Sequence, residues 1–161
     1  SIISDASKNS KRLEALLQST SFKVRVIYLV RDGRAIVHAY LRKYKSCWPG
    51  LYNLISTDSA ARRLMAKYGS ENWLTIRYED MATDLEGTLR NICSFSKINY
   101  ESLMLHPDTS NFNGLGGNRL IKRPIDKIIL DNVWQTEMPR IARSFTSIIV
   151  SKFNRRHGYK N

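Results

Sequence analysis

Three clusters of polar residues carry side chains that suit anion binding or proton transfer. They occupy residues 5–8 (DASK), 31–34 (RDGR) and 78–80 (YED), and each follows a stretch with the pattern of a strand. Arginine holds phosphate or sulfate through a fork of N–H donors, and a carboxylate can accept a proton. The clusters therefore predict a site for an anionic ligand with acid–base groups nearby.

The elements that must position these clusters alternate between strand and helix. Apolar runs predict strands at residues 1–4, 23–30 and 73–77. Helical spacing of apolar residues predicts helices at residues 10–18 and 34–44, a helix at residues 58–67 that Asp58 caps, and a helix after residue 80. A last helix is predicted from Pro139. Its buried stripe would consist of Ile141, Phe145, Ile148, Ile149 and Phe153.

This alternation predicts an α/β domain with a parallel sheet covered by helices. The nearly continuous apolar run that ends at Val30 is expected where both faces of a sheet are covered. No repeat or linker interrupts the chain, so residues 1–161 are predicted to form one domain.

Arg31 is the leading candidate for anion binding. Ligands of parallel sheets bind beyond the carboxyl ends of the strands, where helix N-termini converge. The helix after Arg31 is expected to direct free backbone N–H groups toward the same ligand, which would be a phosphate or sulfate. Alternatively, Arg31 forms an ion pair with Asp32 or Glu79 that ties two loops together. Arg34 is expected to face solvent.

The charge of the chain limits its partners. Lys and Arg number 26 against 14 Asp and Glu, for a net charge of +12. This excess predicts a polyanionic partner: a nucleic acid, an acidic membrane, a sulfated or phosphorylated ligand, or a nucleotide. The two cysteines, Cys47 and Cys93, lack metal-ligand spacing, and no metal is expected.

The sequence contains no signal peptide and no apolar run long enough to span a bilayer. A cytoplasmic setting is therefore predicted. Because the chain opens without Met, further residues are expected upstream, and the Golgi lumen is the alternative location if such a segment carries an anchor.

Residues 27–35 (IYLVRDGRA), running into a helix, resemble the 3′-phosphate-binding segment of sulfotransferases that use 3′-phosphoadenylyl sulfate (PAPS). Other segments resemble bacterial and carbohydrate-type members of that family in the same order: DASKNSKRLEALL, LTIRYEDM, GLGGNRLIKR, LDNVWQTEMPR and RRHGY. The resemblance covers nearly the whole chain and implies a P-loop-NTPase-like sulfotransferase fold in partial form.

The resemblance implies roles in donor binding. Arg31 would grip the 3′-phosphate and Tyr78 would lie at the adenine, although Tyr78 is alternatively a buried strand-end tyrosine. Further nucleotide contacts would come from one Gly-rich basic loop with Gly116, Gly117, Asn118, Arg119, Lys122 and Arg123. A serine that the family commonly has eight residues after the arginine is Ala39 here.

The resemblance places sulfuryl transfer at residues 5–8. Lys8 would stabilise the bridging oxygen and Asp5 would accept the proton of a hydroxyl or amine acceptor; alternatively, Asp5 forms a turn and Lys8 is solvated. The family's loop for the 5′-phosphosulfate has no counterpart in these 161 residues. The chain is therefore expected to supply the 3′-phosphate and adenine side of the donor site, with little or no turnover by itself.

Two other classes of protein fit the composition. A nucleic-acid-binding basic α/β module would combine the +12 charge with Trp48, Tyr52 and Trp73 as stacking surfaces. The basic residues form no single stripe, so nucleic acid is not the expected partner. A catalytically inactive sulfotransferase-like scaffold would keep the fold but bind no adenosine 3′,5′-bisphosphate.

Overall fold

The computed structural model describes residues 2–106 and 128–160. In these ranges, strands β1 (Val26–Val30) and β2 (Trp73–Arg77) pair in parallel, with Val30 beside Arg77. The α/β class with a parallel sheet is confirmed. The helices are α1 (Ser10–Gln18), α2 (Gly33–Tyr44), α3 (Trp48–Tyr68), α4 (Tyr78–Thr83), α5 (Leu85–Ser96), the 3₁₀ helix η1 (Ser102–Leu105), α6 (Trp134–Glu137) and α7 (Arg140–Arg156).

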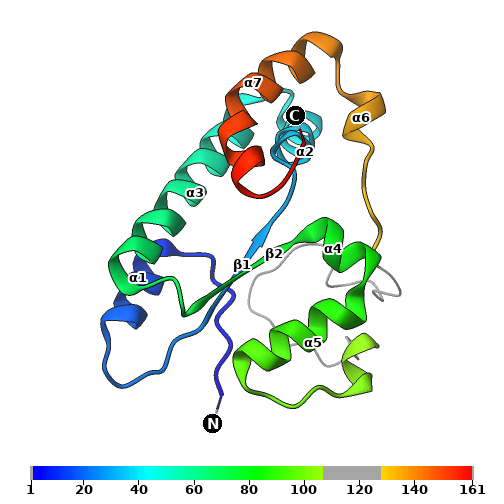
Figure 1. Ribbon diagram of the computed structural model, residues 1–161. Coiled ribbons are helices and arrows are strands. Elements are labelled where there is room, and N and C mark those ends of the chain that lie inside the picture. The colour runs from blue at the N-terminus through cyan, green and yellow to red at the C-terminus, as the bar shows by residue number, and fades with distance from the viewer. Residues whose placement is uncertain (1, 107–127, 161) are drawn as a thin grey trace.

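The helices form two groups around the strands. Figure 1 shows α2, α3 and α7 together beyond the end of β1, whereas α4 and α5 continue from β2 on the other side. The main core lies among α2, α3 and α7, and a second cluster joins α1, α3 and the sheet. The core residues of the first cluster are Val30, Val37, Leu51, Leu54, Met138, Val150, Phe153 and Tyr159.

Side-chain caps and one glycine set several helix ends. Asn9 accepts a hydrogen bond from the amide of Arg12 at 3.1 Å and so caps α1. Asp32 caps α2 in the same way, because its side chain accepts a hydrogen bond from the amide of Arg34 at 2.8 Å. Gly69, with φ of 86°, ends α3 where the sequence predicts it, because this backbone conformation strains any side chain with a Cβ.

Helix α3 begins ten residues before its predicted cap, at Trp48 rather than after Asp58. Pro49 fits the first turn, because its fixed φ suits a helix and no intrahelical N–H donor is needed there. Asp58 therefore lies inside the helix and is buried. A residue expected to cap a helix instead carries a buried charge that other elements must neutralise.

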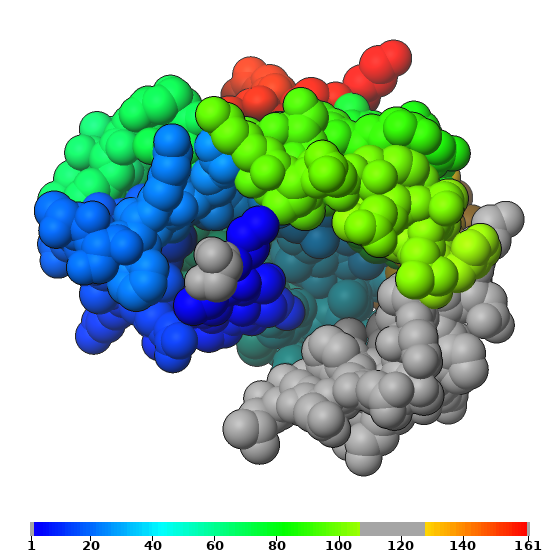
Figure 2. All heavy atoms as spheres, turned by 90° about the horizontal axis from the view of Figure 1, so that it is seen from below, coloured from blue at the N-terminus to red at the C-terminus, as the bar shows by residue number. Residues whose placement is uncertain are grey.

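The predicted strand at the start of the chain is wrong for its described residues. Ile2 and Ile3 are 76% and 80% exposed and belong to no strand, and Figure 2 shows the N-terminal residues at the molecular surface. One face of β1 is also open, because Ile27 and Leu29 are 44% and 51% exposed. Alternate residues of a strand point to opposite faces, so only the face of Tyr28 and Val30 contacts the helical core.

The outer sides of α3 and α7 expose large apolar residues. The stripe predicted to be buried on α7 is wrong in part, because Ile141 and Ile148 are exposed whereas Phe153 is buried. The Trp48 and Phe145 rings meet edge to face, with centroids 5.8 Å apart, which joins the two helices at this surface. We call this surface the α3–α7 apolar face: Trp48, Tyr52, Ile55, Ile141, Phe145 and Ile148. None of the described helices is long and apolar enough to cross a membrane.

Asp58 joins α3 to the end of α7. Its Oδ2 accepts hydrogen bonds from Nε of Arg62 at 3.0 Å and Nη1 of Arg156 at 2.6 Å, and its Oδ1 lies 3.5 Å from Nε2 of His157. Burial alone would raise the pKa of Asp58, but the hydrogen bonds from the two arginines outweigh it and hold the pKa below its usual value. The carboxylate is therefore charged at neutral pH.

We expect Asp58→Ala to lower the free energy of unfolding by about 3 kcal/mol, because it leaves Arg156 without its buried partner. Urea denaturation at neutral pH measures this. The folded-state pKa of Asp58 is depressed, so its contribution is present above the unfolded-state pKa and disappears as pH falls through the folded-state value.

Glu86→Ala is the matched control, because Glu86 forms an exposed ion pair with Arg90 on α5. Such pairs contribute about 0.5 kcal/mol or less. Equal losses of unfolding free energy in the two variants would contradict the buried role of Asp58. A difference in unfolding free energy between Asp58→Ala and wild type that does not shrink in acid would also contradict it.

Candidate functional site

Arg31 and Tyr78 lie side by side at the carboxyl edge of the sheet. Arg31 directly follows β1 and Tyr78 directly follows β2, and the parallel register puts these two positions next to each other. The central carbon of the Arg31 guanidinium is 4.8 Å from the centroid of the Tyr78 ring, a cation–π distance. The structure therefore brings together two of the residues to which the family resemblance gave roles in donor binding.

The chain segment before α6 contacts both residues. Nη2 of Arg31 donates to the backbone oxygen of Asp131 at 2.9 Å and to its Oδ2 at 3.0 Å, and the Tyr78 hydroxyl donates to the backbone oxygen of Ile129 at 2.7 Å. The hydrogen bond from Arg31 holds the pKa of Asp131 below its usual value. Arg31 thus has an acidic partner, which is Asp131 rather than the expected Asp32 or Glu79.

Side chains accept from the amides of Asp32, Gly33 and Arg34 at the start of α2, so the prediction of free backbone donors is wrong for these three residues. The amide of Asp32 donates to Oε1 of Glu79 at 3.2 Å, and the amide of Gly33 donates to Oδ1 of Asn154 at 2.9 Å. The amide of Arg34 donates to the Asp32 cap. Side chains of the protein thus occupy these donors, and the helix start holds the strand ends in place.

Arg34 is largely enclosed, which corrects the expectation that it faces solvent. Its Nη2 lies 2.6 Å from Oδ2 of Asp32 and also donates to the backbone oxygen of Lys160 at 2.7 Å. Its guanidinium stacks over the Trp134 ring, 4.4 Å from the centroid. Arg34 lies only two positions after Asp32, so the acid that caps the helix also neutralises this arginine.

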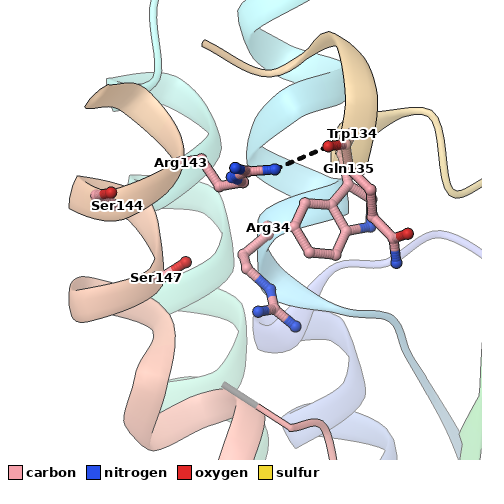
Figure 3. A pocket seen from close by; sticks show the side chains of 6 residues that line it. All are labelled: Arg34, Trp134, Gln135, Arg143, Ser144 and Ser147. Atoms are coloured by element: carbon pink, nitrogen blue, oxygen red, sulfur yellow. Dashed lines mark hydrogen bonds between the residues drawn. The ribbon is translucent and has the colours of Figure 1, made fainter. Parts of the chain in front are cut away.

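A pocket of about 450 Å³ lies among α2, α6 and α7 (Figure 3). Arg34 and Trp134 form one side, and Nη1 of Arg143 donates to the backbone oxygen of Gln135 at 2.8 Å. The remaining lining residues are Ser144 and Ser147. Neither Arg31 nor Tyr78 lines this pocket, so it is separate from the strand-end site.

Asp5 and Lys8 lie in the exposed segment before α1. Oδ1 of Asp5 accepts from the amide of Ser7 at 2.8 Å and Oδ2 accepts from Nε of Arg12 at 2.6 Å. The Ser7 amide, and then Arg12, hold the pKa of Asp5 below its usual value. Within the described ranges, no hydrogen bond or ion pair joins Asp5 or Lys8 to the strand-end pair. Asp5 forms a turn, and the catalytic roles of both residues stay predictions.

The Gly-rich basic loop, with Gly117, Asn118, Arg119, Lys122 and Arg123, lies outside the described residues. Ala39 occupies an exposed position on α2. In the part of the chain that the structure describes, no group of three or more His, Cys, Asp or Glu residues could hold a metal ion.

Sequence reasoning missed Asp131 and Asn154, which fix Arg31 and the start of α2. They lie 100 and 121 residues from their partners, so no local spacing connects them. Polar residues within predicted helical segments were the available signal: Asn154 follows Phe153, lies four residues after Val150 on α7, and is fully buried. A buried amide needs hydrogen-bond partners, which marks such a residue as a structural link.

The comparison with protein families identifies the chain. Its sequence matches the sulfotransferase family over residues 8–102, which is more than half of the 161 residues. The chain belongs to the sulfotransferase family. The matched range includes Lys8, Arg31 and Tyr78, and the family assignment based on the motifs is confirmed.

This sulfotransferase-family chain also resembles a solved structure, the sulfotransferase domain from the curacin biosynthetic pathway. The TM-score is 0.59 at 19% sequence identity, with 84% of this chain and 54% of that chain covered. The likeness shows a shared fold, and the chain spans about half the length of that domain. No curated protein sequence matches the chain.

Gly33 allows α2 to approach α7 closely beside the site. A Cβ at this position would lie 2.9 Å from Cβ of Val150 and 3.0 Å from Cδ2 of Leu54.

We expect Gly33→Ala to lower the free energy of unfolding by about 2 kcal/mol through overpacking, although alanine ordinarily stabilises a helix. Urea denaturation measures the loss. Ser59→Ala on the exposed side of α3 is the control, and a Gly33→Ala chain as stable as wild type would disprove the close approach.

Proposed function

We propose that this chain binds the 3′-phosphate and adenine side of PAPS and takes part in transfer of the sulfuryl group to a hydroxyl or amine acceptor. The observation that carries the proposal is the pairing of Arg31 with Tyr78 at the carboxyl edge of the sheet, 4.8 Å apart. A guanidinium neutralises a phosphate, and an aromatic ring beside it can stack on a purine.

The environment of Arg31 suits a charge-assisted contact. Its side chain is only 22% exposed, so water competes weakly for its N–H groups. Within residues 2–106 and 128–160, its hydrogen bonds use Nη2 alone, whereas a guanidinium has five N–H donors. Asp131 orients the guanidinium, and the remaining donors can face a phosphate.

The other proposed roles follow from the family resemblance. Gly117, Asn118, Arg119, Lys122 and Arg123 would contact the same nucleotide. In the reaction, the bond from sulfur to the bridging oxygen breaks, the acceptor atom bonds to sulfur, and the acceptor's proton passes to a base.

Lys8 would stabilise the bridging oxygen and Asp5 would take the proton. Because the pKa of Asp5 lies below its usual value, Asp5 is a weak base as positioned here. We therefore expect nucleotide binding by the isolated chain and little turnover. A cytoplasmic location stays a prediction.

Calorimetric titration of adenosine 3′,5′-bisphosphate tests the proposal. We expect Arg31→Ala to raise Kd by about 10- to 100-fold, because a hydrogen bond to a charged group contributes about 1.5–3 kcal/mol. Arg90→Ala, which removes an exposed arginine of α5, is the matched control and should keep the wild-type Kd. Equal affinities of Arg31→Ala and wild type would remove the assignment.

The same titration separates the alternative functions. A wild-type chain that binds no bisphosphate at millimolar concentration would favour an inactive scaffold. Affinity for oligonucleotides that rises with their length and falls steeply with salt would favour a nucleic-acid-binding module.

We expect Asp131→Asn to bind the bisphosphate about 3- to 10-fold more tightly than wild type. The substitution removes a negative charge 3.0 Å from Arg31 and keeps an oxygen that can accept its hydrogen bond. The same calorimetric titration measures the change. Weaker binding by Asp131→Asn would mean that the charge of Asp131 is needed to hold Arg31, rather than competing with the ligand.

A further inference from the structure

The C-terminal end of the chain contacts both strand ends of the site. The Tyr159 hydroxyl donates to Oε2 of Glu79 at 2.5 Å, and the backbone oxygen of Lys160 accepts from Arg34. Asn154 binds the amide of Gly33 and donates from Nδ2 to Asp32 at 3.1 Å. Figure 1 shows the C-terminus beside α2. Residues near the C-terminus thus contact the turns that carry Arg31 and Tyr78.

Glu79 is the point where these contacts meet. It follows Tyr78 directly, and its Oε1 accepts from the amide of Asp32, the residue directly after Arg31. Its Oε2 accepts from Tyr159. One carboxylate therefore ties the turn after β1 to the turn after β2, and the Tyr159 hydroxyl fixes the orientation of that carboxylate.

The surroundings of Tyr159 fix its ring and keep its hydroxyl on the Glu79 carboxylate. Its side chain is buried in the main core, and the Arg77 guanidinium lies over its ring at 4.4 Å. Burial, and then the hydrogen bond to Glu79, raise the pKa of Tyr159 above its usual value, so the phenol stays a donor over the ordinary pH range. Packing fixes the ring, and the hydroxyl makes the contact with Glu79.

We infer that Tyr159 is a positioning residue for the nucleotide site: through Glu79 it sets the placement of Arg31 relative to Tyr78. The inference rests on the proposed function for its effect on affinity, but the link from Tyr159 to Arg31 exists without ligand. Tyr159 touches neither Arg31 nor the nucleotide in this scheme, and acts only by holding Glu79 against the amide of Asp32.

Tyr159→Phe tests the inference, because it removes the hydroxyl and keeps the ring in the core. We expect Kd for adenosine 3′,5′-bisphosphate to rise about 3- to 10-fold, with a urea midpoint close to that of wild type. Glu79→Ala breaks the same link from the other side, because it removes both carboxylate oxygens. The double variant should bind no more weakly than Glu79→Ala alone, because Tyr159 acts only through that carboxylate.

A second readout needs no nucleotide. In ¹H–¹⁵N spectra of the free chain, Tyr159→Phe should shift the Nε–H signal of Arg31 and the amide signal of Asp32. Tyr68→Phe, at the far end of α3, is the matched control and should move neither signal. A purely structural role of Tyr159 would lower the urea midpoint and leave these signals in place.

The outcomes separate the inference from the proposed function. Shifted signals together with a weakened Kd support the inference. A wild-type chain that binds no bisphosphate, with both signals still shifted in Tyr159→Phe, would overturn the proposed function and leave the link from Tyr159 to Arg31 intact. Unshifted signals, or an unchanged Kd in a Tyr159→Phe chain, would overturn the inference.

Discussion

The parallel pairing of β1 with β2 is the constraint on which the candidate site depends. Only this register, with Val30 beside Arg77, puts Arg31 and Tyr78 at one edge of the sheet, directly after neighbouring strands. A slip by one residue would turn every side chain of a strand to the opposite face, and would move Tyr28 out of the core. Two five-residue strands are too few to hold such a register alone, so the helices and the strand-end hydrogen bonds must hold it.

Arginine pairing explains how a chain with this much positive charge builds an ordered interior. Asp32 neutralises Arg34, Asp58 binds both Arg62 and Arg156, and Asp131 contacts Arg31. These four arginines face three aspartates, so their charges serve the structure but account for only one unit of the +12 excess. Arg31 differs from Arg34 because its acidic partner is half exposed and holds it through Nη2 only.

Local patterns in the sequence predicted those parts of the fold that depend on local order. The apolar run that ends before Arg31 predicted β1, the turn and α2, and the same reasoning predicted the position of Tyr78 after β2. Partners distant in sequence were not predictable in this way, since nothing near Arg31 specifies Asp131. Two errors arose because apolar spacing does not reveal what covers a residue: Ile2 and Ile148 have suitable patterns but are exposed.

The α3–α7 apolar face has a consequence for the colloidal behaviour of the chain. Copies that each carry a charge of +12 repel one another in dilute buffer, which keeps their exposed Trp48 and Ile148 side chains apart. Salt at about 0.15 M shortens the range of that repulsion to about 8 Å. Sulfate and phosphate also strengthen attraction between apolar surfaces. Solubility of this protein should therefore fall as ionic strength rises, most steeply in sulfate.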